Sequence, residues 1–331
     1  MALNYPRLDN ASGIWTMKEV TDAVKGGYWP VSGARVLVGG GNAPGLVDTI
    51  QFITAATTGD ASDFGDLTTV NSNNMGKCSS SFTRGFWMGG DTGNGGREFI
   101  DYVTIMTAGN GADFGDLTVG RNVGSNANST RAMVWESAAD EGTTIDYFQM
   151  STLGNATDFG DSTLQRGYAG LVESPTRSVK AGGITPTLQN VIDFVSFATL
   201  GNATDFGDLS TAVYENPGVS NSTRGAFGGG FDPAITSAIQ YIEMASTGNS
   251  IEYGDLTGVK KNMGGNSSSN RGIFGGGQTP TISNVIEYFN IPHGGTAVDF
   301  GDLTTATYGP SACSNGHGGL NDGNQGVVDT T

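Results

Sequence analysis

The chain has 331 residues, a formal net charge of −16 and a sequence pI of about 4.3. Nucleic-acid binding needs lysine and arginine side chains that displace counterions from phosphates, so this charge argues against a nucleic-acid partner. Only 15% of the residues are charged and 54 are glycine. This composition is typical of an all-β protein with many tight turns and unlike that of a helical bundle.

The first 33 residues differ in character from the rest of the chain. Within them, Thr16–Gly27 predicts one short helix, because the stretch opens with a capping box and ends in two glycines. Trp15 and Trp29 flank this stretch. A helix this short is marginal by itself, so we expect it to dock, either on the rest of the chain or on a partner protein.

The first residues contain no basic and apolar leader, so we expect no secretory signal. No apolar run is long enough for insertion into a membrane. The two cysteines, Cys78 and Cys313, are too few for a disulfide framework, and no metal-binding spacing such as Cys-x-x-Cys occurs. We interpret them as two small thiols, in the core or at the surface.

After residue 33 the sequence repeats six times with a period of about 47 residues. Each repeat has three markers: an arginine opening a short apolar run that usually ends in glycines, a strand-like run such as Ile-Asp-Tyr, and the phrase Asp-Phe-Gly-Asp. The phrase begins at Asp63, Asp113, Asp158, Asp205, Glu252 and Asp299. A phrase used six times is more consistent with architecture than with catalysis.

One repeat is interpreted as four short antiparallel strands, the third with alternating residues and one buried face. Four strands at this period predict a blade of a β-propeller, and six sets of markers predict six blades. The first repeat begins at its second strand, and the last ends where a first strand would lie. We expect the C-terminal strand to complete the first blade, which closes a propeller over residues 34–319 and leaves 320–331 as a polar tail.

Three positions of the markers receive structural roles. The aromatic residue of the phrase is expected to pack between sheets, and its glycine to permit a conformation or close approach that a Cβ would obstruct. The second acid can accept backbone N–H groups in a turn. The arginine can pair with an acid of its own or the next blade. The acids are Asp66, Asp116, Asp161, Asp208, Asp255 and Asp302, and the arginines are Arg35, Arg84, Arg131, Arg177, Arg224 and Arg271.

Calcium is the alternative interpretation of the phrase, because two carboxylates three residues apart can share a cation with turn carbonyls. Glu252 replaces the first aspartate with no other change of role, and no denser D-x-D-x-D loop occurs. We therefore favour the structural role and expect no cofactor.

Paired glycines at the end of the second strand, followed by a hydrophobic-Asp/Glu-Tyr run in the third, resemble kelch repeats. The resemblance implies a kelch-like propeller over roughly residues 34–319. The sequence departs from kelch repeats in two places. The Asp-Phe-Gly-Asp phrase stands where kelch repeats carry a tryptophan, and the arginine comes just before the glycine strand.

The segment Ala11–Pro30 (ASGIWTMKEVTDAVKGGYWP) is similar to a segment of structural proteins of tailed bacteriophages. The repeats likewise resemble virion proteins of phages that infect cyanobacteria. These resemblances imply a virion component, assembled in the host cytoplasm and carried on the released particle. Residues 1–33 would then contact other virion proteins through Trp15 and Trp29, and the protein would be a homo-oligomer within the particle. No catalytic residue follows from the resemblance.

Binding residues are expected where the repeat is broken. The second copy carries Trp87 and Asp91, and the third carries Trp135 and Glu136 where other copies have glycines. The loops after the glycine strand are predicted to emerge on one face, where exposed aromatic residues suit stacking on sugars or contact with a protein. The alternative is that these are ordinary variable loops and that both tryptophans belong to the core.

Catalysis has little support, because His293 and His317 lie in glycine-rich segments without a nucleophile motif. The many acid pairs leave a glycosidase open. We expect a non-enzymatic phage structural protein, in a module associated with the tail or its fibres, that displays the propeller for binding a protein or a host-surface glycan. The alternatives are a capsid decoration protein and a glycan-active enzyme or lectin on a propeller scaffold.

Overall fold

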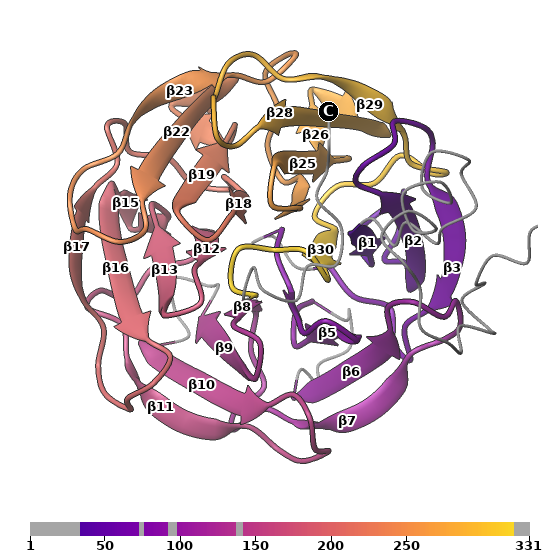
Figure 1. Ribbon diagram of the computed structural model, residues 1–331, viewed down its shortest axis with the longest axis horizontal. Coiled ribbons are helices and arrows are strands. Elements are labelled where there is room, and N and C mark those ends of the chain that lie inside the picture. The colour runs from indigo at the N-terminus through magenta and orange to yellow at the C-terminus, as the bar shows by residue number, and fades with distance from the viewer. Residues whose placement is uncertain (1–33, 73–75, 92–97, 137–141, 321–331) are drawn as a thin grey trace, which may run out of the picture.

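The computed structural model describes residues 34–72, 76–91, 98–136 and 142–320. They form six four-stranded antiparallel sheets that surround a central axis as blades (Figure 1). The predicted six-bladed propeller is confirmed. Its predicted closure is confirmed as well, because the C-terminal strand β30 pairs with β1 of the first blade. The predicted N-terminal helix lies outside the described residues, and within these residues no helix could cross a membrane.

The strands of each blade follow one another from the axis to the rim. Blade 1 contains β30 (Ser311–Ser314), β1 (Arg35–Gly39), β2 (Thr49–Thr54) and β3 (Ser62–Asp66). Blade 2 contains β4 (Ser79–Ser80), β5 (Arg84–Met88), β6 (Phe99–Thr104) and β7 (Ala112–Asp116). Blade 3 contains β8 (Val123–Ala127), β9 (Arg131–Glu136), β10 (Thr144–Gln149) and β11 (Thr157–Asp161).

The second half of the ring repeats this order. Blade 4 contains β12 (Gly170–Glu173), β13 (Arg177–Ala181), β16 (Val191–Ser196) and β17 (Thr204–Asp208). Blade 5 contains β18 (Gly218–Ser220), β19 (Arg224–Gly228), β22 (Ala238–Glu243) and β23 (Ile251–Asp255). Blade 6 contains β24 (Gly264–Ser267), β25 (Arg271–Gly275), β28 (Val285–Asn290) and β29 (Val298–Asp302). Short hairpins extend these three blades: β14 (Ile184–Thr185) with β15 (Thr187–Leu188), β20 (Phe231–Asp232) with β21 (Ala234–Ile235), and β26 (Gln278–Thr279) with β27 (Thr281–Ile282).

Both faces of a blade are buried, which corrects the expectation of one buried face for the third strand. In β10, Ile145 and Tyr147 pack with side chains of blade 4, whereas Phe148 packs with blade 2 on the opposite face. The ring itself is the cause, since each sheet is sandwiched between two others. The alternating polar residue, Asp146, is buried too, and its carboxylate lies 2.9 Å from the guanidinium of Arg121.

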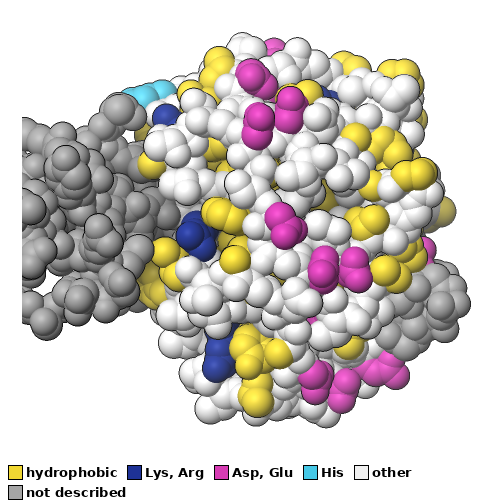
Figure 2. Space-filling view, turned by 90° about the vertical axis from the view of Figure 1, so that its right-hand side faces the viewer, with side chains coloured by type: hydrophobic (Ala, Val, Ile, Leu, Met, Phe, Trp, Pro, Cys, Tyr) yellow, Lys and Arg dark blue, Asp and Glu magenta, His cyan; other side chains and the backbone are white. Residues whose placement is uncertain are grey.

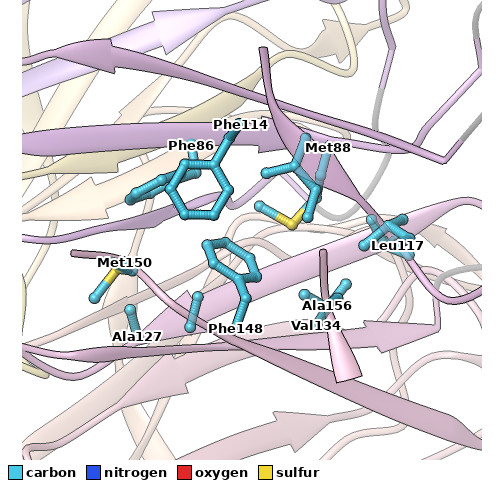
Figure 3. Packing of buried hydrophobic residues seen from close by; sticks show 12 residues of the cluster. Phe86, Met88, Phe114, Leu117, Ala127, Val134, Phe148, Met150 and Ala156 are labelled. Atoms are coloured by element: carbon cyan, nitrogen blue, oxygen red, sulfur yellow. The ribbon is translucent and has the colours of Figure 1, made fainter. Parts of the chain in front are cut away.

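The aromatic residue of each Asp-Phe-Gly-Asp phrase packs between neighbouring blades, as expected. Between blades 2 and 3, the ring centroid of Phe114 lies 5.0 Å from that of Phe86 and 5.2 Å from that of Phe148 (Figure 3). Each such ring buries on the order of 150–250 Å², so these contacts hold adjacent blades together. The other interfaces contain Phe64, Phe159, Phe206, Tyr253 and Phe300.

The glycine of the phrase brings the rim strand of one blade against a turn of the next. Gly207 has a φ of 146°, and the backbone amide of Gly248 donates to the carbonyl oxygen of Phe206 at 2.8 Å. The same contact closes the ring, where the amide of Gly59 donates to the carbonyl oxygen of Phe300 at 2.8 Å. The phrase therefore occurs once per blade because each blade needs this joint.

The prediction that the repeated arginine pairs with an acid is corrected by the structure. Its guanidinium instead stacks on an aromatic ring and donates to a carbonyl oxygen of the next blade. The guanidinium carbon of Arg177 lies 4.8 Å from the ring centroid of Phe194, and the guanidinium donates to the carbonyl oxygen of Met244 in the next blade at 2.9 Å. Corresponding contacts are made by Arg35, Arg84, Arg131 and Arg271. Among the six, and within the described residues, only Arg224 pairs with an acid, Glu243. A stacked ring and a carbonyl thus accommodate the guanidinium without a counter-charge.

The second acid of the phrase also differs from its expected role in a turn, because it ends the rim strand. The backbone amide of Asp208 donates to Oδ1 of Asn249 in the next blade at 3.0 Å. The carboxylate of Asp161 accepts a hydrogen bond from the hydroxyl of Thr143 at 2.8 Å. Figure 2 shows several aspartate and glutamate side chains on the part of the rim that faces the viewer. In the six blades, the second acid of the phrase is Asp66, Asp116, Asp161, Asp208, Asp255 or Asp302.

Candidate functional site on the loop face

Two kinds of connection emerge on the same face of the ring, which we call the loop face. One joins the second strand of a blade to the third, and the other joins the rim strand to the first strand of the next blade. Since all four strands of a blade are antiparallel neighbours, these alternate connections must share a side. Backbone bridges tie them together, as between Tyr214 and Phe231 and between Lys261 and Gln278.

Three half-buried aromatic side chains, which we call the aromatic row, lie together on the loop face over blades 4 and 5. They are Tyr168, Tyr214 and Phe231. Ring centroids are 6.3 Å apart between the two tyrosines and 5.5 Å apart between Tyr214 and Phe231. The row ends at the Nζ of Lys261, which lies 5.6 Å from the Phe231 ring centroid and 2.9 Å from a carboxylate oxygen of Glu215.

An unusual backbone conformation recurs within and beside the aromatic row. Tyr168, Glu215 and Asn262 occupy corresponding places in successive repeats, and all three have positive φ, at 56°, 59° and 55°. The amide of Glu215 donates to the carbonyl oxygen of Tyr168 at 2.7 Å, and the amide of Asn262 donates to that of Glu215 at 3.3 Å. Residues with side chains seldom adopt such φ values, and the strain of about 1–3 kcal/mol each tends to occur at functional sites.

The arrangement suits a ligand with both apolar and hydroxylated surface. Aromatic rings with one accessible face stack on the C–H face of a sugar, while neighbouring charged and hydroxyl groups hydrogen-bond its rim. In the row, the tyrosine hydroxyls, Lys261 and Glu215 supply such groups, and the two charged side chains are 20% and 11% exposed. The aromatic row is therefore the strongest candidate for a binding surface in the part of the chain that the structure describes.

The tryptophans predicted to bind a ligand are core residues, which corrects that prediction and supports the alternative. Trp87 is 1% exposed and packs at the interface of blades 1 and 2. Trp135 is fully buried, and its Nε1 donates to Oγ of Ser178 in blade 4 at 2.8 Å. Both lie in the second strand of a blade, where side chains face the neighbouring sheets, so neither ring can stack on an external ligand.

Glu136 is likewise buried, and it belongs to an ion pair between blades. Its carboxylate lies 2.7 Å from Nζ of Lys180 and accepts a hydrogen bond from the hydroxyl of Ser162 at 2.6 Å. Burial lowers the pKa of Lys180 to about 8, although the charge of Glu136 acts in the opposite direction and raises it. The pair links blades 3 and 4 and, being fully buried, offers no surface to a ligand.

The remaining predicted residues are not brought together with the row. Asp91 is exposed on blade 2, where its backbone amide donates to the carbonyl oxygen of Ser72 at 2.9 Å. Trp15 and Trp29 lie outside the described residues. No group of three or more His, Cys, Asp or Glu side chains within the described residues is placed to hold a metal ion.

Buried charges also meet near the axis. Glu173, at the end of β12, lies 2.9 Å from Nζ of Lys77 and 2.9 Å from Nδ1 of His317, measured from its two carboxylate oxygens. The other ring nitrogen of His317 lies 2.8 Å from the carbonyl oxygen of Ser80. The side chains of Glu173, Lys77 and His317 are at most 2% exposed, so this network joins blades rather than receiving a ligand.

The aromatic row was not predicted, because its residues lie in the connections between the blade strands and not at the departures from the repeat within those strands. The available signal was weaker: Tyr168 and Tyr214 stand in connections that are otherwise rich in polar residues, shortly after the Asp-Phe-Gly-Asp phrase. Comparison with known proteins adds no assignment, since no protein-family model and no curated protein matches the chain.

Proposed function

We propose that this protein is a non-enzymatic component of a bacteriophage particle and that its propeller binds a glycan of the host surface through the aromatic row. The observation that carries the binding role is the contiguous set of half-buried rings, Tyr168, Tyr214 and Phe231, beside the ion pair of Lys261 and Glu215. Rings held in this way offer apolar contact at little entropic cost, because the backbone positions them before the ligand arrives.

The phage assignment rests on the resemblance of the segment Ala11–Pro30 and of the repeats to virion proteins. In this proposal residues 1–33 attach to other virion proteins, and the kelch-like propeller is displayed outwards from the tail or its fibres. A closed ring suits display, because it leaves no long strand edge for unwanted pairing. The net charge of −16 favours solubility in a crowded particle.

Binding is tested with an array of bacterial surface glycans and the purified full-length chain. We expect Tyr214→Ala and Phe231→Ala each to weaken binding by roughly five- to thirtyfold, since a stacked ring contributes on the order of 1–2 kcal/mol. Leu200→Ala is the matched control, because Leu200 is 60% exposed and belongs to a turn between third and fourth strands, on the opposite face. Equal affinity of all variants, or no glycan bound by the wild type, would contradict the binding role.

The place on the particle is tested separately, by immunogold electron microscopy of purified phage with an antibody against the propeller. Gold at the tail or its fibres supports the proposal. Gold over the head supports a capsid decoration protein instead. The absence of label on particles, with the protein present in infected cells, would overturn the virion assignment without affecting the glycan result.

A further inference from the structure

We propose that Cys78 and Cys313 are a redox-reactive pair that forms a disulfide in the presence of a small-molecule disulfide oxidant, and that this bond locks the closing strand of the ring. This inference is independent of the proposed function, because it concerns the core near the axis and not the loop face. The two residues are far apart in sequence, and both are free thiols, 3% and 0% exposed.

The backbone places the two cysteines opposite each other. Lys77 and Ala312 form a parallel bridge, and the amide of Cys78 donates to the carbonyl oxygen of Ala312 at 3.0 Å. In a parallel pair the next residues along each segment, here Cys78 and Cys313, are also neighbours with side chains on the same side. Adjacent β segments lie about 4.7–4.9 Å apart, within the range of about 4.4–6.8 Å between the Cα atoms of a disulfide.

The side chains are in place as well. Both cysteines belong to one hydrophobic cluster between blades 1 and 2. Burial, and then a hydrogen bond with the thiol of Cys313, raise the pKa of Cys78 well above its ordinary value. Because the thiolate is the reactive form, the closed ring protects the pair from oxidation. We therefore expect the bond to form when the closing strand opens or before it has docked.

The reaction is a thiol–disulfide exchange with oxidised glutathione. One protein thiol loses its proton, and the thiolate attacks a sulfur of oxidised glutathione, which gives a mixed disulfide and releases one glutathione thiolate. The second protein thiol, also deprotonated, attacks the protein sulfur of the mixed disulfide and releases the second glutathione. The protein loses two hydrogens, and one molecule of oxidised glutathione is reduced to two thiols.

The bond would join the last strand of the ring to the second blade. Strand β30 is held to β1 by four backbone-paired residues and to the segment before β4 by the amide of Cys78, without any covalent link. A cross-link over so long a loop restricts the unfolded chain strongly, and we expect the melting temperature to rise by roughly 5–10 °C. Whether β30 can detach from the ring would then depend on the redox state of the two cysteines, and the change would be reversible.

The test uses the full-length chain, first reduced and then incubated with oxidised glutathione, both in buffer and in guanidinium near the start of unfolding. After unfolding, maleimide labels any remaining thiol, and mass spectrometry reads the product. The expected product has lost two hydrogens, takes up no maleimide and yields a peptide linking Cys78 to Cys313. Two labelled thiols under both conditions, or a stable mixed disulfide with glutathione, would overturn the proposal.

Single substitutions supply the control. Cys78→Ser and Cys313→Ser retain one thiol each, so oxidised glutathione should leave their melting temperatures unchanged or add one glutathione. An equal rise of melting temperature in wild type and variants would mean that oxidation acts elsewhere. The mass measurement on the wild type needs no variant, so the proposal remains testable if a variant folds poorly.

Discussion

The carbonyl oxygen of Gly248 lies 2.5 Å from the position that a Cβ on Gly207 would take. Blades 4 and 5 meet at this point, and no side chain fits there without displacing backbone. Gly201 has nearly the same φ, 145° against 146°, but nothing lies within 4 Å of its Cβ position. A comparison of the two glycines therefore separates the effect of the backbone conformation from the effect of the close contact between blades.

We expect Gly201→Ala to lower the free energy of unfolding by about 1–3 kcal/mol, through backbone strain alone. Gly207→Ala should cost about 1–3 kcal/mol more, because overpacking at the blade interface adds to the same strain. Guanidinium denaturation followed by circular dichroism measures both values. Similar losses in the two variants would show that the interface yields to the added methyl group.

The buried pair of Lys180 and Glu136 should show strong coupling. Lys180→Met leaves the carboxylate of Glu136 buried without its counter-charge, and we expect a loss of about 3–5 kcal/mol. Adding Glu136→Gln should recover more than half of that loss, since the amide is neutral and can still bond with Ser162. The exposed ion pair of Arg224 and Glu243 is the control. There, Glu243→Gln should cost less than about 1 kcal/mol. Strictly additive losses at positions 136 and 180 would contradict this account.

The lowered pKa of Glu173 predicts that the folded state loses stability in acid. Burial opposes its charged form, but the charges and hydrogen bonds of Lys77 and His317 outweigh burial and hold the pKa of Glu173 below its ordinary value of 4.5. The unfolded chain then binds the proton more readily than the folded one. The stabilising contribution is present above pH 4.5 and is lost as pH falls through the lowered pKa.

This loss is measured as the difference in unfolding free energy between wild type and Glu173→Gln. We expect the wild type to be more stable at pH 7 by several kcal/mol, because the amide leaves Lys77 buried without its counter-charge. The difference should shrink as pH falls below about 4.5, while contributions of other acids cancel. A difference that stays constant from pH 7 to pH 3 would show that Glu173 is not the group responsible.

The stacked arginine should be sensitive to replacement by lysine. Arg271 lies over Tyr288, with its guanidinium carbon 4.6 Å from the ring centroid, and donates to the carbonyl oxygen of Ala55 across the closure at 2.8 Å. Lysine keeps the charge but loses the planar group, so Arg271→Lys should cost about 1–2 kcal/mol. Arg177→Lys, at an interface away from the closure, should cost the same. Unchanged thermal unfolding of Arg271→Lys would contradict the role of stacking.

Much of the fold could be predicted because its signals are local and repeated. Turn glycines, alternating third strands and the Asp-Phe-Gly-Asp phrase each recur once per blade, so the period indicates the blade and the count indicates the ring. The missing first strand of the first repeat predicted the closure by β30. The arginine partners could not be predicted, since Arg177 donates to Met244, a residue of another blade whose carbonyl leaves no mark in the sequence.

The candidate site could not be predicted from the sequence, unlike the fold. By itself the sequence determined the number of blades, their strand order and the pairing of the last strand, β30, with β1, because periodicity and chain order specify these. Only the tertiary structure decided that Trp135 is buried while Tyr214 is half-exposed, and that Cys78 faces Cys313. The exposure of a ring and the pairing of two thiols depend on how neighbouring blades pack, and that packing is a property of the closed ring rather than of any one repeat.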